Sequence, residues 1–139
     1  MIVLDTNVLS ETLRQSPDPQ VLRWLESGTE MTTLTAISAA ELLTGVRLLP
    51  AGKRRTGLLR AIEEVLTQLS RTVLPFDEPA ARIYAKLQAK RRTAGKPLSV
   101  EDGMIAAICL HREFPLATRN TKDFQGLGLE LINPWETQA

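Results

Sequence analysis

The chain has 139 residues, 43% of them hydrophobic and 24% charged, and a formal net charge of +1 at pH 7. This length predicts one domain over residues 1–139, and the near-zero charge argues against a generally polycationic nucleic-acid binder. A single cysteine, Cys109, excludes an intrachain disulfide and a zinc cage. Because no signal-peptide pattern or membrane-spanning apolar stretch is visible, we expect a soluble, cytoplasmic protein without membrane contacts.

Short β-type runs alternate with longer helical runs, which predicts an α/β domain with a mostly parallel central sheet flanked by helices. About five strands are expected, over residues 1–4, 31–34, 72–75, 116–118 and 129–132. Helices are expected over residues 6–13, 18–27, 36–49, 53–70, 77–93 and 100–112, with a further turn or two after Asn120.

Four acids stand beside apolar segments, where an unpaired carboxylate is costly to bury: Asp5, Glu41, Asp102 and Asp123. Asp5 and the segment leading to Asp123 follow strands, at the edge where open α/β sheets place ligands. The first turns of two helices would bring Glu41 and Asp102 to the same edge. Gathered carboxylates repel unless a cation joins them, and oxygen donors suit Mg²⁺ or Mn²⁺. Three further residues would support the site: Thr6, Thr118 and Asn120.

Local structural roles compete with this interpretation. Asp5 or Thr6 could cap the first helix, the run from Ser99 to Asp102 is typical of a capping box, and Asn120 could cap a short helix that contains Asp123. Glu41 has no basic residue three or four positions away along its helix. By contrast, Glu11 can reach Arg14 and is expected to form a solvated surface pair, and His111, the only histidine, is expected at the surface.

Four segments carry a resemblance to a known family. They are Ile2-Val3-Leu4-Asp5-Thr6-Asn7, Ala39-Ala40-Glu41-Leu42, Asp102-Gly103-Met104-Ile105-Ala106-Ala107, and Thr118 to Phe124 followed by Asn133-Pro134-Trp135. In this order they resemble the motifs of PIN-domain ribonucleases, particularly the VapC-type toxins of bacterial toxin–antitoxin pairs. The resemblance covers essentially the whole chain. One departure is Glu113-Phe114-Pro115, which replaces the Gly-containing turn often seen before the fourth strand.

The resemblance implies a PIN-like three-layer domain and a Mg²⁺-dependent endoribonuclease with Asp5, Glu41, Asp102 and Asp123 as its acidic quartet. Asp5, Asp102 and Asp123 would be metal ligands, and Glu41 a ligand or the group that orients water. RNA would be cut to 5′-phosphate and 3′-hydroxyl ends. The family further implies a homodimer and a small antitoxin whose tail reaches the active site, with DNA contacted only through the antitoxin.

Two other functions stay open at this stage. A Mg²⁺-dependent phosphatase would use Asp5 as its nucleophile, although such enzymes usually carry a second Asp where this chain has Asn7. A non-catalytic metal-binding or DNA-complex subunit would act only with a partner. Arg82, Lys86 and Lys90 recur every four residues and could bind RNA phosphates, or form an ordinary solvated helix face.

Overall fold

The computed structural model describes residues 1–28, 30–69 and 73–136. Its sheet contains β1 (Ile2–Leu4), β2 (Thr32–Thr33), β3 (Leu116–Ala117) and β4 (Leu131–Ile132). The strands are paired in parallel in the order β2-β1-β3-β4, so β1 and β3 occupy the interior positions. The expected α/β class with a mostly parallel sheet is therefore confirmed.

The expected fifth strand over residues 72–75 is wrong. Residue 72 lies outside the described residues, and Leu74 forms only an isolated parallel bridge with Thr35. Pro75 has no N–H group with which to continue a ladder, and Asp77 already caps the next helix. Within the described residues, the sheet thus has four strands and one additional bridge at Thr35, just after β2.

The helices begin and end close to the predicted positions. They are α1 (Thr6–Thr12), α2 (Pro19–Ser27), α3 (Ala36–Arg47), α4 (Lys53–Leu69), α5 (Glu78–Thr93) and α6 (Val100–Arg112), and the expected turn after Asn120 is a 3₁₀ helix, η1 (Thr121–Phe124). Side-chain caps explain several starts: Asp18 accepts a hydrogen bond from Gln20 N, and Asp77 accepts one from Ala80 N. None of the helices in the described part of the chain has both the length and the apolar character needed to cross a membrane.

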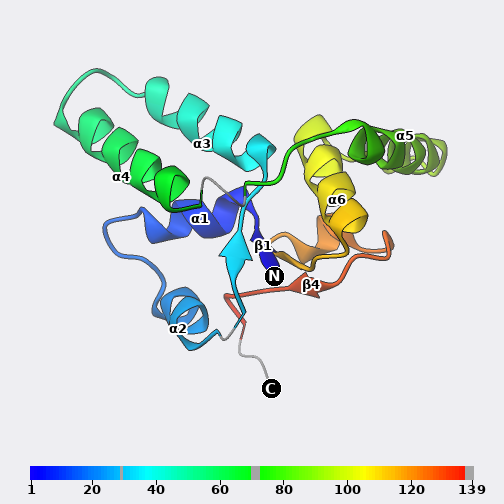
Figure 1. Cartoon of the computed structure of the whole chain (residues 1–139), viewed down its shortest axis with the longest axis horizontal. Helices are drawn as coiled ribbons and strands as arrows, with labels where there is room; N and C mark the ends of the chain where they lie inside the picture. Colours follow the sequence, from blue (N-terminus) through cyan, green and yellow to red (C-terminus); the bar gives the residue numbers. More distant parts are fainter. Residues whose placement is uncertain (29, 70–72, 137–139) are drawn as a thin grey trace.

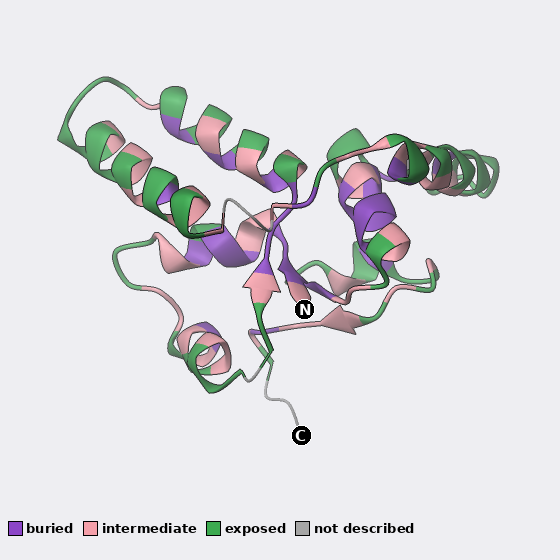
Figure 2. Ribbon diagram, in the orientation of Figure 1, coloured by how far each residue is buried: buried purple, intermediate pink, exposed green. Residues whose placement is uncertain are grey.

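The sheet separates two apolar clusters, because successive strand residues point to opposite faces. Val3 and Leu116 belong to the cluster with α5, α6 and η1, whereas Leu4 and Ala117 belong to the cluster with α1 to α4. Figure 1 shows these two groups of helices on either side of the strands. Figure 2 shows buried residues on the inner faces of the helices, whereas the outer strand β4 is of intermediate burial; of the strands, β1 and β3 are the most buried. Since every strand runs the same way, the residues after β1 and β3 emerge at one shared edge.

Candidate active site

Asp5 lies at the carboxyl end of β1 and is 5% exposed. Its Oδ1 accepts a hydrogen bond from Thr6 N (2.8 Å), and its Oδ2 accepts bonds from Thr118 Oγ1 (2.7 Å) and Asn7 Nδ2 (3.2 Å). Asp5 is also the N-cap of α1, so it caps the helix and lies at the site at the same time. Burial raises the pKa of Asp5, and the nearby Glu41 carboxylate raises it further, against the lowering effect of these donors.

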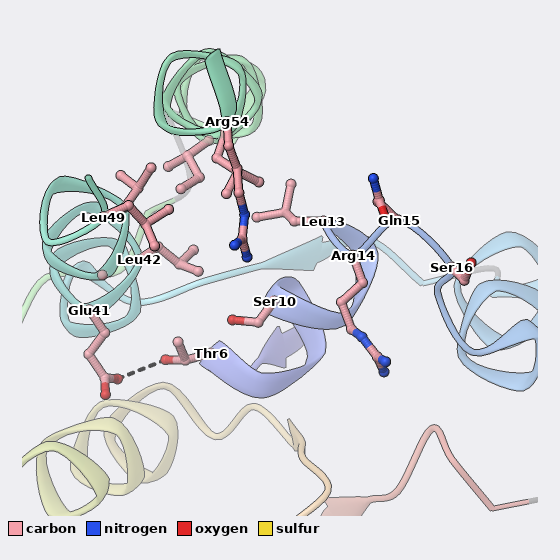
Figure 3. A pocket seen from close by; sticks show the side chains of 14 residues that line it. Thr6, Ser10, Leu13, Arg14, Gln15, Ser16, Glu41, Leu42, Leu49 and Arg54 are labelled. Atoms are coloured by element: carbon pink, nitrogen blue, oxygen red, sulfur yellow. Dashed lines mark hydrogen bonds between the residues drawn. The ribbon is translucent and has the colours of Figure 1, made fainter. Parts of the chain in front are cut away.

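Glu41 projects from α3 toward the start of α1. Thr6 Oγ1 donates to Glu41 Oε1 across 2.7 Å, as Figure 3 shows, and also lies 3.0 Å from Ser38 Oγ. Glu41 is exposed, and of its two carboxylate oxygens only Oε1 accepts a hydrogen bond within the described chain. The contact with Thr6 joins α3 to the segment that carries Asp5.

Asp102 is half-buried in the first turn of α6. Its backbone N–H donates to the N-cap Ser99 Oγ at 3.1 Å, so the predicted local cap is present. Burial raises the pKa of the Asp102 carboxyl, and the charges of Asp5 and Asp123 raise it further. Asp102 also lines one pocket together with Asp5 and Glu41, which a cap alone does not require.

Close packing of α6 on α5 sets the position of Asp102. A Cβ atom at Gly103 would meet the Tyr84 ring at 2.7 Å, so only glycine permits this approach. The buried Gln88 side chain bonds both backbone groups of Leu98, with Nε2 donating to its oxygen at 2.8 Å and Oε1 accepting from its nitrogen at 3.2 Å. These contacts anchor the loop immediately before α6.

Asp123 is exposed in η1, and the buried neighbour Phe124 anchors that turn in the core. The Arg91 guanidinium of α5 donates to the Asp123 backbone oxygen. Asn120 occupies the N-cap position without a side-chain cap bond, so the alternative in which its side chain caps this helix does not hold. Its backbone N–H instead donates to Thr118 Oγ1 at 3.1 Å.

Asp5, Glu41 and Asp102 line one pocket of about 440 Å³ at the carboxyl edge of the sheet, which we call the acidic pocket. Thr6 and Asn120 line it too, whereas Thr118 supports it from beneath through Asp5. Asp123 is not part of this lining and is linked to it through its charge on Asp102. The structure thus brings three of the four predicted acids into one pocket, with the fourth beside it.

A divalent ion fits the chemistry of this donor set, although no three Asp, Glu, His or Cys side chains in the described ranges are close enough to enclose one. Mg²⁺ in proteins usually takes one or two carboxylates and keeps several waters, so it does not need a complete protein cage. The hydrogen-bond donors to Asp5 are all neutral, and burial together with nearby acids raises the pKa values of both Asp5 and Asp102. The pocket therefore has excess negative charge and oxygen donors, as a hard cation requires.

A second hollow adjoins the acidic pocket. A groove of about 870 Å³ runs between α1, α3 and α4, and we call it the apolar groove. The groove takes this name from six aliphatic side chains, which lie beside polar ones that include two arginines. The aliphatic residues and the arginines are Leu13, Leu42, Val46, Leu49, Leu58, Ile62, Arg14 and Arg54. Figure 3 shows the Arg54 side chain extending from α4 into this space. Four residues line both hollows, which therefore share a wall: Thr6, Ser10, Arg14 and Glu41.

Glu11, Arg119 and Trp135 also line the acidic pocket, and the sequence did not identify them as site residues. Glu11 pairs with Arg14 at 3.1 Å as expected, but the prediction that this pair is solvated is wrong for Glu11, which is 4% exposed and accepts a bond from Asp18 N at 2.9 Å. The spacing within α1 could not reveal that the following loop folds back onto this carboxylate. Arg119 lies in the segment from Thr118 to Phe124 and Trp135 ends the segment Asn133-Pro134-Trp135, but neither segment indicates that the two side chains are in contact.

The predicted basic stripe lies away from the acidic pocket. Arg82, Lys86 and Lys90 are exposed on α5 and none of them lines the pocket. Arg82 pairs with Glu78 at 2.8 Å, which is typical of a solvated helix face. His111 is also distant from the site, with its Nε2 3.8 Å from Asp77 Oδ2.

Comparisons with known proteins agree with this arrangement. The family model described as the PIN domain matches residues 2–128. The VapC ribonuclease Y4jK of Sinorhizobium fredii is 49% identical, over 98% of this chain and 99% of its own length. The crystal structure of FitAcB from Neisseria gonorrhoeae superposes with a TM-score of 0.91 at 42% identity, covering 99% of this chain and 100% of that one. VapBC-5 of Mycobacterium tuberculosis, from the VapBC family of toxin–antitoxin systems, has a TM-score of 0.67 at 28% identity over 94% of this chain and 96% of that one.

Proposed function

Because the chain belongs to the PIN-domain family, we propose that it is a metal-dependent endoribonuclease and the toxin of a toxin–antitoxin pair. The observation that carries the proposal is the convergence of Asp5, Glu41 and Asp102 in one pocket at the carboxyl edge of the sheet. A relative named a ribonuclease, identical at 49% of positions, supports the choice of RNA.

Asp5, Asp102 and Asp123 would hold Mg²⁺ or Mn²⁺, directly or through water. When bound, the ion supplies Lewis acidity toward the scissile phosphate and acidifies water for attack. Asp5 is held in one orientation by its three hydrogen bonds, so its charge is fixed where the cation is needed. This pre-organisation removes the cost of reorienting the carboxylate during the reaction.

Glu41 is suited to orient the attacking water or to accept its proton. Thr6 holds Oε1, and Oε2 of this exposed residue accepts no hydrogen bond within the described chain, so it can accept one from a water molecule. In-line attack by water on the phosphorus, with departure of the ribose 3′-oxygen and its protonation, would give 5′-phosphate and 3′-hydroxyl ends.

The test is cleavage of RNA by the purified, partner-free protein with Mg²⁺ and with EDTA. Asp5→Asn should lower single-turnover cleavage at least about a hundredfold, since losing a metal ligand removes several kcal/mol of transition-state stabilisation. The matched control is Asp18→Asn, because Asp18 also caps a helix but does not line the acidic pocket. It should cleave like the wild type.

Two outcomes would favour the competing functions. Metal binding without cleavage of any RNA would indicate a non-catalytic subunit. A trapped aspartyl-phosphate on Asp5 would indicate a phosphatase, although both oxygens of Asp5 accept hydrogen bonds and Asn7 donates one of them.

The apolar groove supports a protein partner, and we assign it to the cognate antitoxin. An amphipathic segment could place its aliphatic side chains against Leu42, Val46 and Ile62 and continue into the acidic pocket, where Glu41 attracts a basic group. DNA would then be contacted through the antitoxin only.

We also propose a homodimer, for which light scattering should give about twice the 15.4 kDa chain mass.

A further inference from the structure

We propose that Arg119 and Trp135 form a nucleotide-binding subsite beside the acidic pocket, in which the Trp135 ring stacks on a base and Arg119 binds a phosphate of the same single strand. The inference rests on the proposed RNA-cleaving function and adds to it the residues that hold the strand next to the acids. Both residues line the acidic pocket together with Asp5 and Asp102.

The adjacency of β3 and β4 brings the two residues together. Arg119 comes two residues after β3 and Trp135 three residues after β4, and these strands pair in parallel. The Arg119 guanidinium carbon lies 5.0 Å from the centroid of the Trp135 ring, within the range of a cation–π contact. The contact places a planar cation over the Trp135 ring, at the same edge of the sheet as the acids.

Both residues are anchored at the backbone while their polar or aromatic groups remain accessible. Arg119 N donates to Asn7 Oδ1 at 3.3 Å, and Asn7 in turn donates to Asp5. Trp135 N donates to Asn133 Oδ1 at 3.0 Å, and its half-buried ring packs against the apolar cluster of α1 to α4. A ring fixed in this way loses little conformational entropy when a base stacks on it.

Charge distinguishes Arg119 from Arg14, the other cation that lines the pocket. Arg14 pairs with the buried Glu11 at 3.1 Å, whereas Arg119 has no carboxylate within ion-pair distance in the described part of the chain. A guanidinium held by an aromatic ring keeps its N–H donors for a phosphate, which it can bind with two parallel bonds. The acids of the pocket repel the phosphates of RNA, and the Arg119 charge at the same pocket would offset this repulsion.

The experiment measures the affinity of a fluorescent single-stranded RNA octamer by anisotropy in EDTA, over a series of salt concentrations. Trp135→Ala should weaken binding about tenfold, within the range found when a stacking aromatic is removed, and Trp135→Phe should retain most of the affinity. Arg119→Gln should weaken binding severalfold and reduce the salt slope by about 0.7, the value for one phosphate of a single strand.

The controls remove the same groups elsewhere. Trp24→Ala changes the other tryptophan, which lies outside the acidic pocket, and Arg23→Gln removes an exposed charge from α2. An RNA with abasic sites should bind wild type and Trp135→Ala alike, because no base remains to stack. Since Trp135 packs on the core, thermal unfolding is measured for each variant, and the exposed Arg119→Gln tests the proposal independently of folding.

Two results would overturn the subsite. If Trp135→Ala weakens binding no more than Trp24→Ala, or if Arg119→Gln leaves the salt slope unchanged while the wild type binds and cleaves RNA, the subsite is wrong and the nuclease function stands. If the wild type neither binds nor cleaves RNA, the function fails and the subsite with it.

Discussion

At the scale of single residues, the Asp5 carboxylate accepts three hydrogen bonds, and each comes from a neutral group: Thr6 N, Asn7 Nδ2 and Thr118 Oγ1. Capping of α1 needs only one acceptor, which Asn or Ser would supply as well. A full charge at a buried position is unfavourable for the metal-free fold, since burial and Glu41 both raise the pKa of Asp5. The charge at this residue is therefore better explained by the site than by the helix.

The same reasoning gives a prediction for Asp102. Asp102→Asn should leave the unfolding free energy in EDTA unchanged or raise it slightly, because removing the repulsion from Asp5 and Asp123 offsets a helix-dipole contribution of about 0.3–1 kcal/mol. RNA cleavage at saturating Mg²⁺ should nevertheless fall at least about a hundredfold. The measurements are chemical denaturation and single-turnover cleavage.

Glu101→Gln is the control for that variant, since Glu101 is an exposed acid in the same helical turn and does not line the pocket. It should cleave normally. If Asp102→Asn instead cleaves normally and unfolds much more easily, Asp102 has a capping role only.

At the scale of elements, the arrangement of α1, α3 and α4 leaves the apolar groove beside the acidic pocket. Gly45 lines this groove on α3, and a Cβ atom there would meet nothing within 4 Å. Gly57 on α4 is equally open but does not line the groove. The two glycines therefore form a matched pair for testing the groove without disturbing the core.

Gly45→Trp should fill the groove and weaken antitoxin binding by at least about tenfold, because the bulky ring occupies the space of the partner. RNA cleavage by the free protein should persist. Gly57→Trp should leave both properties unchanged, and each variant should fold, since replacing a mid-helix glycine costs no helix propensity. Isothermal titration with the cognate antitoxin measures the effect. Equal affinities for the two variants would place the antitoxin elsewhere.

At the scale of the whole molecule, local signals predicted the elements and long-range contacts decided the rest. Caps such as Asp18, Asp77 and Ser99 fixed helix starts within the sequence itself. The strand predicted near Leu74 was wrong because Pro75 could not extend the hydrogen-bond ladder. The burial of Glu11 was missed because it depends on the loop at Asp18, which folds back onto this carboxylate. The contact between Arg119 and Trp135 requires knowing that β3 and β4 are neighbours, which short strands do not reveal.

The acidic pocket should determine how the unfolding free energy of the metal-free protein depends on pH. Burial and nearby acids raise the pKa values of Asp5 and Asp102, so the folded state binds their protons more tightly than the unfolded chain, where an Asp titrates at about 4. Their contribution to stability is therefore largest below about pH 4 and is lost as the pH rises through the folded-state values. In EDTA, the unfolding free energy of Asp5→Asn should fall less than that of the wild type as the pH rises. A loss of hydrogen bonds in the variant lowers its stability equally at every pH, so it does not change this slope.

Mg²⁺ should act in the opposite direction, because only the ionised acids bind it. Its stabilisation of the wild type should be full at neutral pH and should disappear as the pH falls toward about 4, where protons compete for the same oxygens. Chemical denaturation at a series of pH values, in EDTA and in saturating Mg²⁺, measures both effects on one protein. Asp18→Asn again serves as the control, since that acid caps α2 outside the pocket and should leave the Mg²⁺ effect intact. A Mg²⁺ stabilisation that is equal at acidic and neutral pH, or that survives in Asp5→Asn, would show that the cation binds somewhere other than the acidic pocket.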